Sequence, residues 1–94
     1  PHKEGKSFLN ISGSVVALKG GKPVAVFEKQ GKTLRVFEEK YLGEAIKLFV
    51  EEYKKGQIFK NKKRIQVKEY PFDAAKSLAE NGFGREVLGY SLYR

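Results

Sequence analysis

Cysteine, histidine and aspartate, which act as nucleophiles, general bases and metal ligands, are scarce in this chain of 94 residues. It contains no cysteine, one histidine, His2, and one aspartate, Asp73. Without cysteine there is no thiolate nucleophile, no disulfide and no cysteine-ligated zinc. His2 falls in residues 1–7, which we expect to be frayed. Asp73 falls where a helix is expected to begin, and there a carboxylate serves the unpaired N–H groups of the first turn.

Four of the ten glutamates are adjacent in two couples, Glu38 with Glu39 and Glu51 with Glu52. Both couples fall in a predicted helix or at its start, where neighbouring positions do not face each other. Neither couple therefore makes an acid–base dyad, and both are interpreted as solvated faces. The sequence predicts no catalytic residue, no metal ligand and no cofactor site in this chain.

Three glycine-containing strings imitate nucleotide-binding loops and fail in spacing or context. Gly31-Lys32-Thr33 ends like a Walker A motif, but the required first glycine falls at Val26 and the string lies between two predicted strands. Gly5-Lys6-Ser7 has too little chain before it. Gly82-Phe83-Gly84 lacks the last glycine of a dinucleotide fingerprint and follows a helix instead of preceding one. We therefore expect the isolated chain to hydrolyse no ATP.

The pattern that does indicate binding is a run of cations in residues 54–64, which contain no acidic residue. Six cations fall in these eleven residues: Lys54, Lys55, Lys60, Lys62, Lys63 and Arg64. Lysines neutralise phosphates without reading bases, so the run predicts contact with a nucleic-acid backbone. The other interpretation is a solvated loop. Phe59 lies inside the run, where it either stacks on a base or packs into the core, and we favour the core.

The net charge of +8 agrees with a polyanionic partner, nucleic acid before acidic membranes. Solubility alone is the competing explanation for a charge of this size. The tips of the predicted hairpins add five further cations, Lys19, Lys22, Lys29, Lys32 and Arg35.

Strands are expected first along the chain. Residues 14–19, 23–29 and 33–38 alternate or are rich in β-branched residues, and short glycine turns join them, so they predict an antiparallel meander. Residues 8–11 form a short apolar stretch that can open a further strand. Residues 64–70 and 85–94 are the last two predicted strands.

Helices are expected where apolar residues begin to recur every three or four positions. Residues 39–55 form the first helix, whose apolar face is Leu42, Ala45, Ile46, Phe49, Val50 and Tyr53. Pro71 opens the second, whose apolar face is Phe72, Ala75, Leu78 and Ala79. Asn81-Gly82 closes it, and Phe83 is expected to fold back onto Leu78. The result is one α+β domain, 1–94, ordered β-β-β-α-β-α-β: a meander extended into a mixed sheet with both helices on one face.

The remaining bulk features fit a cytoplasmic protein. No run of about 18 apolar residues is present, so no membrane span is expected. The absence of cysteine agrees with a reducing compartment. Methionine is also absent, even at position 1, which indicates a processed piece of a longer protein or a trimmed sequence.

Six segments, in this order and spacing, resemble the C-terminal region of large helicase-related (Lhr-type) DEAD/DEAH-box ATP-dependent helicases: 13–18 (GSVVAL), 21–28 (GKPVAVFE), 31–34 (GKTL), 64–69 (RIQVKE), 78–83 (LAENGF) and 89–92 (GYSL). The likeness covers residues 13–94. The chain departs from the pattern at Tyr70-Pro71, at Asn81 in place of alanine and at Tyr90 in place of leucine.

The resemblance implies a parent that moves 3′ to 5′ on nucleic acid, usually in DNA repair. Its ATP and Mg²⁺ would be held by motor domains that this chain does not contain, and no catalytic residue of the family maps onto it. The chain is then expected to be an accessory C-terminal module that contacts nucleic acid through phosphates and contacts the rest of the helicase. A protein-interaction or oligomerisation module without nucleic-acid contact is the alternative.

Overall fold

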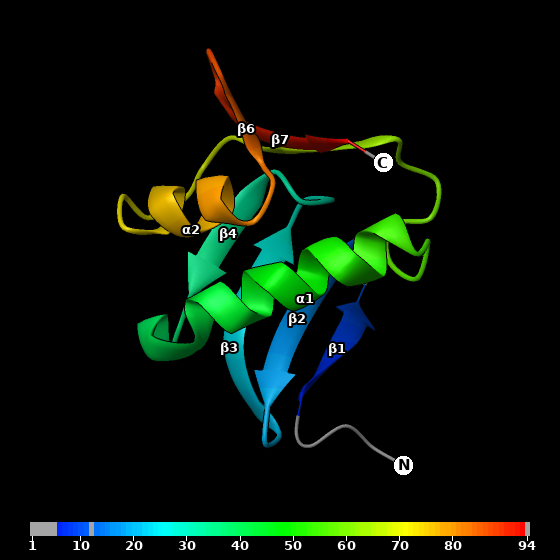
Figure 1. Cartoon of the computed structure of the whole chain (residues 1–94). Coiled ribbons are helices and arrows are strands. Elements are labelled where there is room, and N and C mark those ends of the chain that lie inside the picture. Colours follow the sequence, from blue (N-terminus) through cyan, green and yellow to red (C-terminus); the bar gives the residue numbers. More distant parts are fainter. Residues whose placement is uncertain (1–5, 12, 94) are drawn as a thin grey trace.

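Strands and helices follow one another largely as expected, and the α+β class is confirmed. The structure is a computed structural model that describes residues 6–11 and 13–93 (Figure 1). Its elements are β1 (Lys6–Ile11), β2 (Ser14–Lys19), β3 (Lys22–Glu28), β4 (Thr33–Val36), the 3-10 turn η1 (Glu39–Tyr41), α1 (Leu42–Lys54), β5 (Arg64–Val67), α2 (Ala74–Glu80), β6 (Gly84–Glu86) and β7 (Gly89–Tyr93).

The predicted meander is a four-stranded antiparallel sheet in the order β1-β2-β3-β4. Its extra strand, β1, contains the apolar stretch 8–11 and begins at Lys6, so residues 6 and 7, which were expected to be frayed, belong to a strand. His2 lies outside the described residues. Gly20 and Gly21 form the two-residue turn between β2 and β3, with φ of 61° and 81°. Positive φ at both positions suits the right-handed twist of the flanking strands, which explains the two glycines.

The remaining strands form a second antiparallel sheet in the order β5-β7-β6, so the expected single mixed sheet is divided in two. The predicted strand 64–70 ends early, and its continuation runs parallel to the start of β4. There the Leu34 N–H donates to the Glu69 carbonyl at 2.8 Å, and the Lys68 N–H donates to the Lys32 carbonyl at 2.8 Å. This short parallel contact joins the two sheets.

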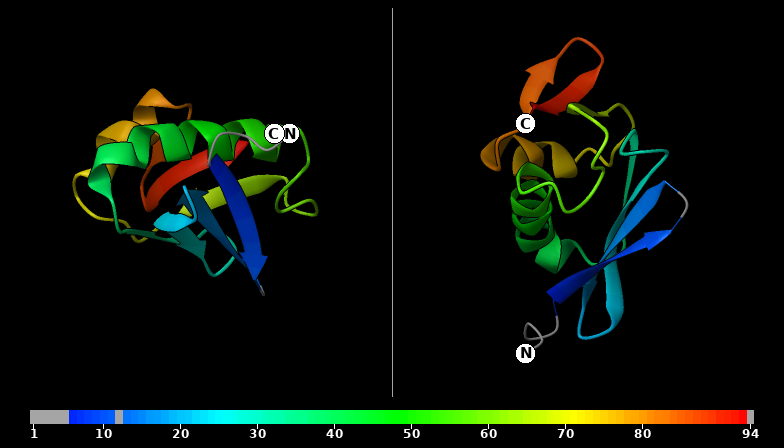
Figure 2. Two further views of the ribbon diagram at one scale, coloured as in Figure 1. Left: turned by 90° about the horizontal axis from the view of Figure 1, so that it is seen from below. Right: turned by 90° about the vertical axis from the view of Figure 1, so that its right-hand side faces the viewer.

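Both helices pack against the sheets and against each other (Figures 1 and 2). Helix α1 contacts β2 and β3, and α2 contacts β6 and β7. The apolar face predicted for α1 is confirmed, since five of its six residues are buried: Leu42, Ala45, Ile46, Phe49 and Tyr53. Val50, the sixth, is half-buried against the same core.

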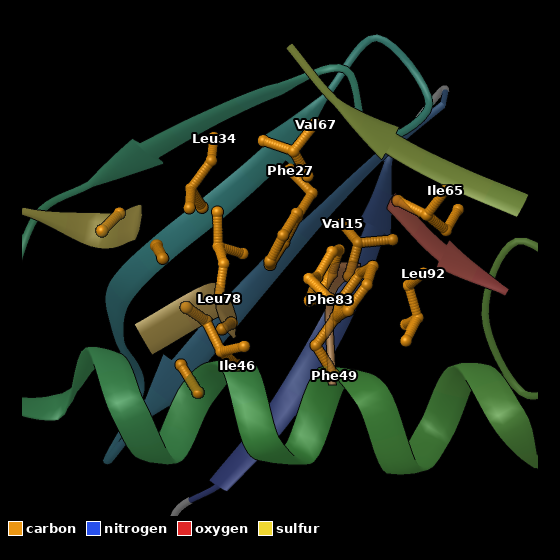
Figure 3. Packing of buried hydrophobic residues seen from close by; sticks show 14 of the residues in the cluster. Val15, Phe27, Leu34, Ile46, Phe49, Ile65, Val67, Leu78, Phe83 and Leu92 are labelled. Atoms are coloured by element: carbon orange, nitrogen blue, oxygen red, sulfur yellow. The ribbon is translucent and has the colours of Figure 1, made fainter. Parts of the chain in front are cut away.

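An aromatic cluster fills the space between α1 and the strands, with Phe49 at its centre (Figure 3). The Phe49 ring stacks on Phe27 with 3.9 Å between centroids. Four more rings lie 6.1–6.4 Å from it: Phe8, Tyr53, Phe59 and Phe83. Phe59 is half-buried with its ring edge against Phe49, so it packs on the core as we favoured.

Helix α2 begins at Ala74, three residues later than Pro71. Phe72 therefore precedes the helix and is 90% exposed, so its placement on the apolar face was wrong. Asp73 occupies the N-cap without a capping hydrogen bond, because its backbone is already helical (φ −69°, ψ −16°) and not extended. The predicted helix end is confirmed: Gly82 has φ of 105°, and the Phe83 N–H donates to the Leu78 carbonyl at 3.0 Å.

Candidate nucleic-acid interface

The six cations of residues 54–64 lie where α1 ends and β5 begins, on the right of Figure 1. Lys54 is the last residue of α1, and Arg64 is the first of β5. Between them the chain turns back in a loop that is anchored by Ile58, which is 4% exposed, and by the hydroxyl of Tyr53, which donates to the Lys62 carbonyl at 2.7 Å. The loop is thus fastened through backbone and apolar groups, which leaves its charged side chains at the surface.

Five of the six cations are exposed, and Lys62 is half-buried. The amino groups of Lys55 and Lys62 lie beside polar side chains. The Nζ of Lys55 lies 3.9 Å from a carboxylate oxygen of Glu52, and the Nζ of Lys62 donates to Oε1 of Gln30 at 3.4 Å. An exposed ion pair of this length, such as that of Lys55 with Glu52, contributes little to stability.

The contact between Lys62 and Gln30 brings the β3–β4 turn against this loop. That turn carries Lys29 and Lys32, both exposed, and Gln30 itself is fixed by its N–H, which donates to the Gly13 carbonyl at 2.8 Å. Eight cations from two segments therefore gather at one end of the molecule, called the basic end below: Lys29, Lys32, Lys54, Lys55, Lys60, Lys62, Lys63 and Arg64.

Two of the other predicted turn cations, Lys19 and Lys22, lie apart from the basic end. Lys19 and Lys22 flank the β2–β3 turn, at the opposite end of β3 from the β3–β4 turn (Figure 1). Lys19 is also engaged, since its Nζ lies 3.5 Å from Glu44 and 4.4 Å from the centre of the Tyr41 ring. The Arg35 Nε donates to Glu28 at 2.8 Å. The fold therefore separates these five cations, because Lys29 and Lys32 lie at the basic end whereas Lys19 and Lys22 lie at the other end of β3.

Arg64 differs from the lysines because it lies in a strand, β5, where it is the cross-strand partner of Tyr93. A hydrogen bond to the Tyr93 hydroxyl is the main cause that raises the pKa of Arg64, and the negative charge of Glu86 raises it further. The Glu86 carboxylate in turn accepts hydrogen bonds from the Ser91 hydroxyl at 2.7 Å and from the Tyr93 hydroxyl at 3.0 Å. Arg64 therefore places its positive charge beside Tyr93 and Glu86 of the second sheet.

Glu86 is expected to make the stability of the β6–β7 hairpin depend on pH. Hydrogen bonds from Ser91 and then Tyr93, together with the charge of Arg64, lower the pKa of Glu86 below its ordinary 4.5. A carboxylate whose pKa is lower in the folded state stabilises the fold above its unfolded pKa, and this contribution is lost as pH falls through the folded pKa. Glu86→Gln should therefore lower the melting temperature at pH 7 and lower it less at about pH 3. An equal loss at both pH values would contradict this role of the carboxylate.

The described residues offer no metal site, since they contain no group of three or more potential ligands. Gly31-Lys32-Thr33 lies between β3 and β4, which is the strand–turn–strand context expected from the sequence. The adjacent glutamate couples remain on exposed or half-buried surface. Among the described helices, none has the length and apolar character needed to span a membrane.

Comparisons with protein-family models, with curated protein sequences and with solved structures found no match to this chain.

Proposed function

We propose that this chain is a non-catalytic module that holds a nucleic-acid backbone at its basic end. The observation that carries the proposal is the gathering of eight cations on two neighbouring segments, in a chain with a net charge of +8. The likeness of residues 13–94 to the end of Lhr-type helicases supports a setting as the C-terminal accessory domain of a cytoplasmic ATP-dependent helicase. ATP and Mg²⁺ would then act in the motor domains of the parent.

The chemistry of the basic end suits phosphates better than base edges. Seven of its eight cations are lysines, which act as point charges on flexible stems and carry no geometric code for a base. Binding is therefore expected to be non-specific and salt-dependent. If about four phosphates are contacted, the logarithm of affinity should fall with the logarithm of salt concentration at a slope near −3, with dissociation constants about micromolar or weaker at physiological salt.

The test is a fluorescence-anisotropy titration of labelled single-stranded and duplex DNA at several salt concentrations. The charge-reversal variant Lys60→Glu, Lys62→Glu, Lys63→Glu should lose binding, because it places three acids within the basic end. The control variant Lys22→Glu, Lys40→Glu, Lys76→Glu carries the same net charge, but its exposed lysines lie on the β2–β3 turn, η1 and α2. Its binding should weaken much less.

Two outcomes would overturn the proposal. The first is no binding by the wild-type chain at about 50 mM salt, where phosphate contacts are strong. The second is an equal loss from both variants, which would show that only net charge matters. Circular dichroism of each variant checks that the fold is retained.

A protein-interaction module is the second candidate, and one observation favours it. Val87 and Leu88 form the tip of the β6–β7 hairpin and are 100% and 63% exposed. Exposed aliphatic side chains at a projecting tip suit an apolar pocket on a partner, such as the rest of the parent chain or a second copy. Salt distinguishes the two candidates, because an apolar contact does not weaken as salt rises whereas phosphate binding does.

A further inference from the structure

In the described part of the chain, both helices lie on one side of the three-stranded sheet and no helix covers its outer face (Figures 1 and 2). Side chains alternate along each strand, and Ile65, Val67, Tyr90 and Leu92 point into the core. The opposite face carries Arg64, Gln66, Glu86, Ser91 and Tyr93. Every one of these five side chains bears a hydrogen-bonding group, and none is aliphatic.

Tyr93 is the aromatic ring on this face, and its position is fixed. Its side chain is 53% exposed, yet its hydroxyl is held at 3.0 Å from one carboxylate oxygen of Glu86. The other oxygen of the same carboxylate accepts from Ser91 at 2.7 Å, so Glu86 is itself immobilised. A ring held at its far end loses little conformational freedom when it binds something.

Arg64 connects this ring to the basic end. It is the cross-strand partner of Tyr93 and also the last of the six cations in residues 54–64. A strand whose phosphates follow the lysines of the loop would therefore reach the edge of the sheet beside Tyr93. The negative charge of Glu86 on this face is offset by Arg64 and by two hydroxyl donors, so it does not oppose that path strongly.

We propose that Tyr93 is a stacking platform for an unpaired nucleobase, so that the module prefers single-stranded over duplex nucleic acid. The inference rests on the proposed function and names its substrate class. A single strand presents the faces of its bases to an exposed aromatic ring, while duplex bases are already stacked on both sides.

The experiment compares ring removal with ring retention. Tyr93→Leu keeps an apolar side chain but removes the aromatic face. Tyr93→Phe keeps the face and removes only the hydroxyl. Each variant is titrated with a single-stranded oligonucleotide containing one 2-aminopurine, and with the duplex of the same sequence, at about 50 mM salt. Stacking on the ring should quench the 2-aminopurine fluorescence.

Tyr93→Leu should weaken single-strand binding about 5- to 100-fold and abolish the quenching, because stacking contributes that much per base. Its duplex binding should change less than about twofold, since phosphate contacts remain. Tyr93→Phe should retain single-strand binding within about threefold, because the π-face remains. Phe37→Leu is the matched control: Phe37 is an aromatic residue of similar exposure, 55%, just after β4, and its loss should change neither titration.

The failures of the two proposals are distinguishable. A wild-type chain that binds neither nucleic acid contradicts the proposed function, and the stacking site with it. A chain that binds both forms but is unaffected by Tyr93→Leu, or is weakened equally for both forms, overturns the stacking site alone. A loss in Tyr93→Phe as large as that in Tyr93→Leu would assign the effect to the Glu86 contact and would also overturn it.

Discussion

Phe49→Ala is expected to lower the free energy of unfolding by about 3–5 kcal/mol, because it removes a large buried ring and leaves a cavity. Phe49 is 0% exposed and is stacked on Phe27 at 3.9 Å. Its other ring neighbours come from β1, the end of α1, the loop after α1 and the segment before β6, so one substitution loosens contacts among several elements. A domain of this size has a total stability of about 5–15 kcal/mol, so the variant should be close to unfolding.

Thermal and urea denaturation followed by circular dichroism measure this loss. Phe72→Ala is the matched control, because Phe72 is the same residue type but is 90% exposed. It should change the free energy of unfolding by less than about 0.5 kcal/mol. A Phe49→Ala variant as stable as Phe72→Ala would contradict the central position of Phe49 in the core.

Elements whose local signals agree were predictable from the sequence. Helix α1 has a long apolar stripe with the helical period, and its buried residues are those of the predicted face. The end of α2 was also predictable, because Gly82 supplies the positive φ that lets Phe83 turn back onto Leu78. These structures depend on residues close in sequence, so their patterns are visible without knowledge of the fold.

The division of the last predicted strand was not visible, because the β6–β7 turn has an unusual composition. Its two tip residues are Val87 and Leu88, which favour strands and not turns. The glycine signal falls one residue later, at Gly89, whose φ is 145°. The two sheets are joined by backbone hydrogen bonds between Lys32–Leu34 and Lys68–Glu69. No local sequence pattern predicts that long-range contact.

The candidate site shows the same limit. Residues 54–64 were found because six cations fall within eleven consecutive residues. Lys29 and Lys32 join them only through the contact of Gln30 with Lys62, and Tyr93 joins only through its cross-strand pairing with Arg64. Pairing across strands of distant segments cannot be read from the residues alone, so the sequence predicted part of the basic end and none of the aromatic face.

Gly89→Ala is expected to destabilise the second sheet by about 3 kcal/mol or more, since it combines backbone strain with a clash. A φ of 145° is accessible to glycine but strained for a residue with a side chain. A Cβ at this position would also overlap the carbonyl oxygen of Val67 and would lie 3.1 Å from the Cα of Lys68. Both obstacles are backbone atoms of β5 and its continuation, so no side-chain rotation relieves them, and β7 must move away from β5.

Gly20→Ala separates the two causes of this loss. Gly20 also has positive φ, 61°, but a Cβ there would meet no atom within 4 Å. Its loss should be only about 1–2 kcal/mol, from the left-handed backbone alone. Hydrogen exchange then localises the effect: Gly89→Ala should increase exchange at the amides that pair β5 with β7 and leave the pairing of β2 with β3 protected. Loss of stability in Gly89→Ala no greater than in Gly20→Ala would show that the close approach of β7 to Val67 is absent.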